Sequence, residues 1–153
     1  MLTLYTSPLS GNGRKVHMLL EEVGASYQLA KLDLMKEKQK TSDYLKLNPN
    51  GKVPTLVDDG FILWESNAIL LYLAEKFPAV KLVPASLQDR ARMFQWLLFE
   101  QTTFRPPLSF LVRQTRFTPP DKQDAVMIEQ SWAEVRTNIG ILQNALAERE
   151  YIG

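Results

Sequence analysis

Short apolar runs and one helical stripe alternate along the first third of the chain. Residues 2–5 alternate with β-branched and aromatic side chains, which predicts a first strand. Apolar residues then recur at i, i+3, i+4 and i+7, which predicts a helix from about Arg14 to Glu22 with one buried face. Gly24 is a natural helix stop, and residues 27–32 predict a second strand. A strand, helix and strand in this order imply a parallel, right-handed crossover.

The pattern continues with a charged stretch, a hairpin and a helix. Residues 36–40 predict a solvated loop or short exposed helix, and a short helix is expected at 43–47. Pro54 opens a strand at 55–57, residues 58–60 form a tight turn, and 61–63 return as the partner strand. A helix is expected at 68–77, capped by a preceding Ser or Asn and ended by Pro78. Residues 1–78 therefore predict a compact α/β unit with the order βαβ-α-ββα and a mixed sheet.

The pattern changes to helix alone after a linker at residues 79–86. A helix is predicted from 87 to about 105, and Pro106 and Pro107 are expected to kink or break it. Residues 108–117 predict a further helical stretch. The last helix has the most regular stripe, with apolar residues at steps of three and four, namely Ala125, Ile128, Trp132, Val135, Ile139, Leu142 and Leu146.

Composition and charge exclude several kinds of chemistry. The 153 residues carry a net charge of +1 and no basic run stands out, so no nucleic-acid partner is expected. The absence of cysteine removes disulfides, thiolate metal sites and a cysteine nucleophile, and the single His17 cannot build a zinc site alone. No metal is therefore expected. No apolar run approaches the roughly 20 residues needed to cross a bilayer, and a strand at residue 2 leaves no room for a signal peptide, so the expected location is cytoplasmic.

The turn between the first strand and the first helix is the strongest candidate for a binding site. It is rich in Ser, Gly, Asn and Pro, and Ser7, Ser10 and Asn12 supply two hydroxyls and an amide. A helix start presents free backbone N–H groups and the positive end of the helix dipole, which together favour an anion. The alternative is that Ser10 or Asn12 merely caps the helix.

Three motifs in register give the chain a resemblance to a known family. They are Ser7-Pro-x-Ser10-x-Asn12-x-x-Lys15, then Asn48-Pro-Asn-Gly-Lys-Val-Pro54, then Glu65-Ser66-Asn67-Ala-Ile. In this order on this pattern of elements, they resemble the cytosolic glutathione S-transferases, in particular bacterial theta-, beta- or nu-like members of the serine or asparagine type. The resemblance implies a thioredoxin-like domain at residues 1–78 that binds glutathione as co-substrate, an all-α domain at 87–153, and a homodimer. Family members continue with several more helices, so the helical domain looks incomplete, and its last helix is expected to lack partners for its apolar face.

The resemblance assigns the thiol to the first turn. A free thiol is mostly protonated at neutral pH, and a hydroxyl donor beside a helix start stabilises the thiolate. Ser10 stands at the family position of that donor, and no base nearby could make it a nucleophile instead. Asn12 is the rival, because its side-chain amide can also donate to the sulfur.

The other two motifs are expected to hold the rest of glutathione. Val53-Pro54 resembles the family's cis-proline turn, which aims the Val53 backbone at the cysteinyl part in the manner of an added strand. Glu65 and Ser66, at a helix start, suit the γ-glutamyl end. For the glycyl carboxylate, the resemblance suggests Lys52 as charge partner and Gln39 as a neighbour. Each position also has a plain structural interpretation, as a strand start, a cap or a solvated surface residue.

The resulting functional prediction is a glutathione transferase that conjugates the thiolate to small electrophiles. One alternative keeps the site and changes the reaction to glutathione-dependent reduction of disulfides or peroxides. Another is a non-enzymatic binding module of the same fold.

Overall fold

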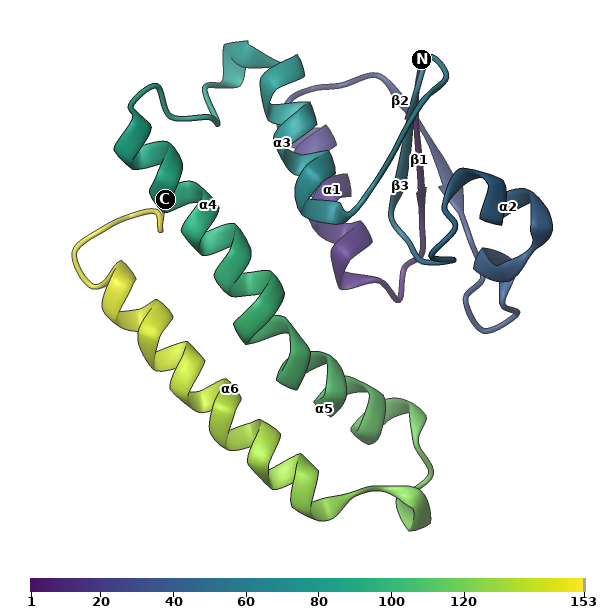
Figure 1. Ribbon diagram of the computed structural model, residues 1–153, viewed down its shortest axis with the longest axis vertical. Helices are drawn as coiled ribbons and strands as arrows, with labels where there is room; N and C mark the ends of the chain where they lie inside the picture. The colour runs from purple at the N-terminus through teal and green to yellow at the C-terminus, as the bar shows by residue number, and fades with distance from the viewer. Residues whose placement is uncertain (153) are drawn as a thin grey trace. The chain divides into compact units, whose positions relative to one another are not determined.

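The chain divides into two compact units in its computed structural model, which describes residues 1–152. The first unit spans residues 1–83 and combines a sheet with helices, and the second begins at Pro84 and is built of helices alone (Figure 1). The division falls within the stretch 79–86 that the sequence predicts as a linker. Among residues 1–152, none of the helices combines the length and apolar character that crossing a bilayer requires.

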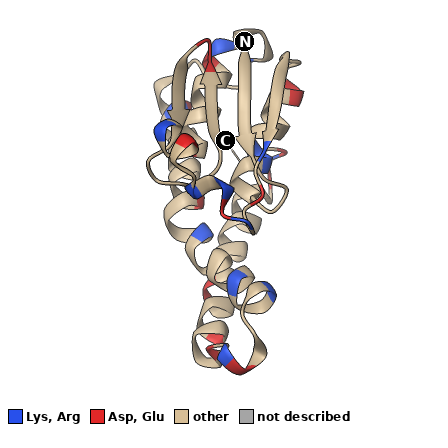
Figure 2. Ribbon diagram, turned by 90° about the vertical axis from the view of Figure 1, so that its right-hand side faces the viewer, with Lys and Arg blue, Asp and Glu red and all other residues tan. Residues whose placement is uncertain are grey.

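The first unit is organised around a four-stranded mixed sheet. Its strands are β1 (Leu2–Thr6), β2 (Tyr27–Lys31), β3 (Thr55–Asp58) and β4 (Phe61–Trp64). They lie in the order β2-β1-β3-β4, with β1 parallel to β2 and antiparallel to β3, and β4 antiparallel to β3. Figure 2 shows the strands of this sheet side by side. The parallel crossover and the hairpin are both as predicted from the sequence, and the thioredoxin-like βαβ-α-ββα order is confirmed.

Two helices, α1 (Gly11–Glu22) and α3 (Ser66–Lys76), bury their apolar stripes against this sheet. The core consists of side chains that water does not reach, namely Leu4, Val16, Leu20, Leu56, Ile69 and Leu73. The short elements are α2 (Ser42–Leu47) and the 3-10 turns η1 (Lys38–Lys40) and η2 (Pro78–Val80). Both long helices begin earlier than predicted, α1 before Arg14 and α3 before Ala68, because apolar periodicity does not mark the polar first turn of a helix.

The second unit consists of helical segments that follow one another without a gap from α4 to α5, and a last helix that packs against α5. Its elements are α4 (Leu87–Phe99), the π-helical turn η3 (Glu100–Phe104), α5 (Arg105–Phe117), the 3-10 turn η4 (Pro120–Lys122) and α6 (Ala125–Leu146). The last helix has its predicted bounds. Pro106 and Pro107 do not end helical structure: they stand in the first turn of α5, directly after the π turn. Proline fits the first turn of a helix because its fixed φ matches the helical value.

The buried face of α6 differs from the predicted apolar stripe. Val135 is buried as expected, but its buried neighbours are Ser131 and Asn138. Trp132 and Ile139, both predicted on the buried stripe, are 43% and 40% exposed. Helix α6 packs against α5 and η3 along one side, so part of its apolar surface lies outside that contact.

Candidate functional site

Strand pairing gathers the predicted site residues at one end of the sheet. Tyr5, near the end of β1, lies opposite Thr55 at the start of β3, and Thr55 in turn lies opposite Trp64 at the end of β4. The turn after β1, the Val53-Pro54 turn before β3 and the Glu65-Ser66 step after β4 therefore share this edge. The three motifs that are far apart in sequence thus meet in one place.

Ser10 is the N-cap of α1. Its Oγ accepts a hydrogen bond from the backbone N–H of Gly13 at 3.0 Å, and its own N–H donates to the Ser7 carbonyl at 3.0 Å. The capping interpretation of Ser10 is therefore correct. It leaves the hydroxyl proton free to be donated elsewhere, because capping uses only the oxygen as acceptor.

Gly13 lets the start of α1 lie against β1. A Cβ at this position would stand 2.0 Å from Oγ1 of Thr6, which is far inside any real contact. Thr6 itself is buried at the end of β1. Any larger residue at position 13 would therefore push the helix start, and Ser10 with it, away from the sheet.

Asn12 lies inside the first turn of α1 and does not cap it, so that alternative is wrong. Its Oδ1 is buried and has no hydrogen-bond partner among residues 1–152, while the residue as a whole is half-buried. Gln39 has the same arrangement, with a buried and unpartnered Oε1. Buried acceptors without partners are uncommon enough in native structures to need an explanation.

The loop before β3 has the predicted cis peptide between Val53 and Pro54. Gly51 precedes it with a φ of +58°, a conformation that favours glycine. The Gln39 carbonyl and the Lys40 side chain pack where a Gly51 side chain would be, and Lys40 Nζ donates to the Asn50 carbonyl at 3.4 Å. Gln39 therefore lies beside the loop that carries Lys52, whose side chain is exposed. Lys40 was not predicted from the sequence as a residue of this loop region, and only its position next to Gln39 could have indicated it.

The start of α3 completes this edge of the sheet. Glu65 precedes the helix with a φ of +72°, an uncommon conformation for a residue other than glycine, and its side chain makes no capping bond. Ser66 is buried at the first helical position. Lys15 of α1 donates to Oδ1 of Asn67 at 2.6 Å and so ties the two helix starts together. A backbone held in an unfavourable conformation is a feature that functional sites often retain.

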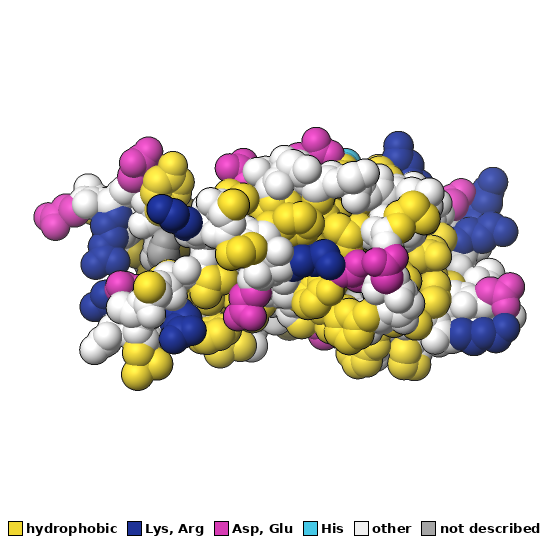
Figure 3. All heavy atoms as spheres, turned by 90° about the horizontal axis from the view of Figure 1, so that it is seen from above, with side chains coloured by type: hydrophobic (Ala, Val, Ile, Leu, Met, Phe, Trp, Pro, Cys, Tyr) yellow, Lys and Arg dark blue, Asp and Glu magenta, His cyan; other side chains and the backbone are white. Residues whose placement is uncertain are grey.

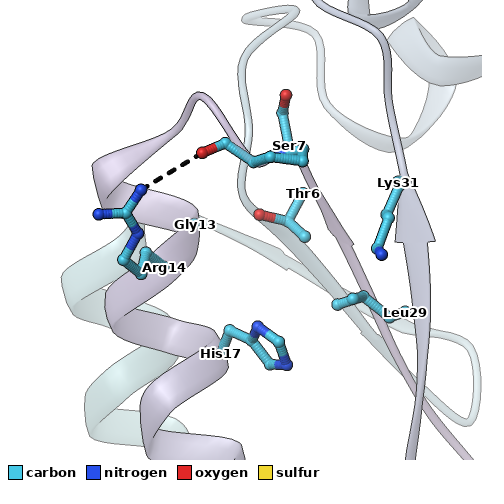
Figure 4. A pocket seen from close by; sticks show the side chains of 8 residues that line it. Thr6, Ser7, Gly13, Arg14, His17, Leu29 and Lys31 are labelled. Atoms are coloured by element: carbon cyan, nitrogen blue, oxygen red, sulfur yellow. Dashed lines mark hydrogen bonds between the residues drawn. The ribbon is translucent and has the colours of Figure 1, made fainter.

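A separate cavity of about 220 Å³ lies between α1 and β2 (Figure 4). Its walls include Ser7, His17, Leu29 and Lys31, and none of the eight predicted site residues lines it. Arg14 folds back toward the turn, where Nη2 donates to the Pro8 carbonyl at 3.4 Å. His17 lies 3.7 Å from the Glu21 carboxylate and packs edge-on against the Tyr27 ring. These two contacts hold the His17 ring between α1 and β2.

No group of three or more possible metal ligands among His, Cys, Asp and Glu gathers within residues 1–152. The side chains at the shared edge include hydroxyl, amide and ammonium groups beside two helix starts. Such a set can hold an anionic ligand and stabilise a thiolate.

The chain is similar to known glutathione transferases in sequence and in structure. Residues 1–75 match the family model described as "Glutathione S-transferase, N-terminal domain". Glutathione S-transferase F10 of Arabidopsis thaliana is 32% identical over 156 residues, which cover 99% of this chain and 72% of that protein. A theta class glutathione S-transferase from Xanthomonas axonopodis pv. citri, solved with glutathione bound, superposes with a TM-score of 0.91 at 32% identity, covering 99% of this chain and 72% of the other.

The fungal glutathione transferase URE2P6 of Phanerochaete chrysosporium, solved in complex with oxidized glutathione, gives a TM-score of 0.90 at 32% identity. That match covers 99% of this chain and 70% of the fungal chain. Sequence similarity over nearly the whole of this chain, a shared fold and the three motifs at one edge of the sheet agree with one another. The chain belongs to the glutathione S-transferase family.

Proposed function

We propose that this protein binds glutathione at the edge of the sheet and transfers its thiolate to small electrophilic substrates. In this reaction the thiolate sulfur attacks an electrophilic carbon, the bond from that carbon to its leaving group breaks, and the thiol proton goes to solvent. The protein contributes binding, orientation and stabilisation of the thiolate.

The observation that carries the proposal is the set of donors at the start of α1. Ser10 uses its oxygen as acceptor in the cap, so its hydroxyl proton is available to a thiolate. Asn12, two residues on, has a buried Oδ1 without a partner, and its Nδ2 is proposed as the second donor. Donors aimed at a charged sulfur favour the ionised form, and the helix start adds to this effect. Ser10 and Asn12 are thus proposed to donate together to the thiolate sulfur.

The remaining candidates suit the two carboxylates of glutathione. Ser66 and the uncapped start of α3 are proposed to bind the γ-glutamyl carboxylate, with Glu65 accepting from its ammonium group. The half-buried Gln39 and the exposed Lys52 are proposed to bind the glycyl carboxylate. Val53 and Pro54 are proposed to pair with the cysteinyl backbone.

A second candidate reaction is glutathione-dependent reduction of disulfides or peroxides. It is favoured by the oxidized glutathione bound in two structural relatives, URE2P6 and URE2P8 of Phanerochaete chrysosporium. A chain without cysteine can catalyse such a reaction if two glutathione molecules react in turn. With a disulfide, the first thiolate attacks one sulfur and forms a mixed disulfide as the other sulfur leaves as a thiolate; the second glutathione thiolate attacks the glutathione sulfur of that mixed disulfide, which forms glutathione disulfide and releases the second substrate thiolate. With a peroxide, the first thiolate takes one oxygen and breaks the O–O bond to give glutathione sulfenic acid and an alcohol or water, and the second thiol converts the sulfenic acid to glutathione disulfide and water.

We also propose a homodimer as the functional form. Large hydrophobic side chains are exposed on α4 within the second unit, namely Leu87, Phe94 and Leu98. Apolar side chains also reach the surface in Figure 3, separated by charged ones. Apolar side chains on one helix that no other element covers fit a subunit interface. Sedimentation equilibrium, with Leu98→Glu as the variant expected to be monomeric, tests this assignment.

The thiolate assignment is tested by the pKa of the bound thiol, followed by thiolate absorbance as pH is varied. Ser10→Gly removes the hydroxyl at little cost to the cap, and Asn12→Asp keeps the shape while replacing the donor with an acceptor. Each variant is expected to raise the thiol pKa by about 1 unit and to lower kcat/KM toward an aryl halide about 10-fold or more. Ser42→Ala, at the exposed start of α2, is the matched control and should change neither value.

Two results would overturn the proposal. A folded wild-type protein that does not bind glutathione in a calorimetric titration cannot be a transferase of this kind. A bound thiol whose pKa stays unchanged in both variants would show that Ser10 and Asn12 do not contact the sulfur. Turnover of a disulfide without turnover of any electrophile would select the reductase reaction instead.

A further inference from the structure

Behind the Val53-Pro54 turn lies a closed hydrogen-bond network that the sequence motifs do not explain. Its members are Tyr44 of α2, Asn48 after α2, and Thr55 of β3, and all three are buried. Tyr44 Oη donates to the Lys52 carbonyl at 2.6 Å, and Asn48 Nδ2 donates to the same carbonyl at 2.9 Å. Two side chains therefore hold one backbone oxygen.

The direction of every bond in the network follows from these two. The phenol proton is used on the Lys52 carbonyl, so across the 2.8 Å contact between the two hydroxyls it is Thr55 that donates to Tyr44. Thr55 Oγ1 in turn accepts the second amide proton of Asn48 at 3.1 Å, and Asn48 Oδ1 accepts from the Asn50 N–H at 3.0 Å. Every proton and carbonyl in the set has a partner. A fully satisfied buried network of this kind fixes a single conformation.

The fixed carbonyl determines where the next N–H points. In a trans peptide the C=O of one residue and the N–H of the next point in opposite directions across the same plane. Since the Lys52 carbonyl is turned inward to Tyr44 and Asn48, the Val53 N–H is turned outward. That N–H has no hydrogen-bond partner within residues 1–152. It is the group that the proposed function pairs with the cysteinyl backbone of glutathione.

We propose that Tyr44 and Asn48 are positioning residues for the cysteinyl subsite, because their hold on the Lys52 carbonyl aims the Val53 N–H at the ligand. This inference rests on the proposed binding of glutathione. Burial raises the pKa of Tyr44, so the phenol stays protonated and keeps its donor role across the neutral range. Neither side chain needs to touch glutathione itself.

The test compares variants that release the carbonyl with one that does not. Tyr44→Phe and Asn48→Ala each remove one donor to the Lys52 carbonyl. Thr55→Val disturbs the same buried network but leaves both of those bonds, so it controls for lost stability. In calorimetric titrations well below the unfolding temperature, Tyr44→Phe and Asn48→Ala should weaken glutathione binding about 3- to 10-fold, and Thr55→Val by less than about 2-fold.

A second readout follows the Val53 amide directly. In ¹⁵N-labelled wild type, saturation with glutathione should shift the Val53 N–H resonance downfield, as formation of a hydrogen bond does. In Tyr44→Phe this shift should shrink, whereas shifts at Gly13 and Ser66 should persist. If all three variants lost affinity in proportion to the fall in their unfolding temperatures, the positioning role would be overturned and the network would be merely structural. Unchanged affinity and an unchanged Val53 shift in both Tyr44→Phe and Asn48→Ala would overturn it too, while a wild type that binds no glutathione would instead refute the proposed function.

Discussion

Asp58 is a buried carboxylate at the end of β3, opposite the predicted site along the strand. It accepts hydrogen bonds from Tyr72 Oη at 2.5 Å and from Lys76 Nζ at 2.6 Å, both on α3. The Lys76 hydrogen bond, followed by that of Tyr72, lowers the pKa of Asp58 below its ordinary value. The same contacts raise the pKa of Tyr72 and of Lys76. This cluster links the last half of α3 to the sheet by charge as well as by apolar packing.

A depressed pKa in the folded state makes the contribution of Asp58 to stability depend on pH. The contribution is complete above the unfolded value of 3.8 and is lost as pH falls through the lower folded value. Asp58→Asn should therefore lower the urea midpoint by a constant amount between about pH 5 and pH 8. The difference from wild type should shrink toward zero as pH falls below 3.8. Urea unfolding followed by fluorescence at each pH measures this directly.

Asp43→Asn is the matched control, because Asp43 forms an exposed ion pair with Lys46 on α2. Exposed pairs contribute little, so this variant should track wild type at every pH. A wild-type advantage over Asp58→Asn that persists unchanged at pH 3 would contradict the depressed pKa.

The roles of residues that depend on neighbours in sequence could be predicted, whereas the roles of residues that depend on contacts distant in sequence could not. Ser10 stands just before an apolar stripe, so a helix start and a donor could be predicted there. Asp58 was predicted only as part of a turn, because nothing near it in sequence announces Tyr72 and Lys76. Tyr44 was predicted within a short helix with no further role. Its partner is the backbone carbonyl of Lys52, and the identity of the Lys52 side chain does not indicate which groups bond that carbonyl.

The passage from α4 to α5 shows how an element can absorb two prolines. Pro107 has no N–H to donate to the carbonyl four residues earlier, which is that of Thr103. Asn138 of α6 supplies the donor instead, through Nδ2 at 3.2 Å, and is itself buried. Periodicity predicted position 138 to lie off the apolar stripe. An amide is nevertheless buried there because the backbone of the neighbouring element lacks a donor.

Removal of this amide should destabilise the second unit. Asn138→Ala leaves the Thr103 carbonyl without its side-chain donor in a part-buried position, at an expected cost of about 1–3 kcal/mol in the free energy of unfolding. In a Pro107→Ala background the restored N–H can serve that carbonyl, so the cost of Asn138→Ala should fall by about half or more. Asn144→Ala, on an exposed part of α6, should change the free energy by less than about 0.5 kcal/mol. Equal costs of Asn138→Ala with and without Pro107 would show that the two residues are not coupled.

The candidate site residues lie in one of the two units, whereas the predicted apolar stripes run through both. All eight candidate residues, from Ser10 to Ser66, lie in the first unit, residues 1–83. Antiparallel pairing of β1 with β3 and of β3 with β4 brings the three motifs together, which is why a pattern of elements read from sequence could locate the site. Gln39, in η1 after β2, is instead placed by the packing of its carbonyl beside Gly51. The helices of the second unit could be predicted, but not which of their faces are buried. Burial of a face depends on the neighbouring helices, and a stripe of apolar residues does not identify those neighbours.

Glutathione should therefore protect one unit of the molecule against hydrogen exchange. With ligand at 100 times its Kd, binding adds about 2.7 kcal/mol to the stability of the state that binds it. Amides in the turn 7–13, the loop 51–54 and the start of α3 should slow most, because they lie where the ligand is proposed to bind and exchange through local opening. Amides within α6, from Ala125 to Leu146, should exchange at unchanged rates, since no candidate residue lies in that unit. Mass spectrometry of peptides from exchange with and without glutathione separates the two regions. Equal slowing in α6 would show that the first unit does not hold the ligand alone, because protection of a distant helix requires that binding stabilise that helix as well.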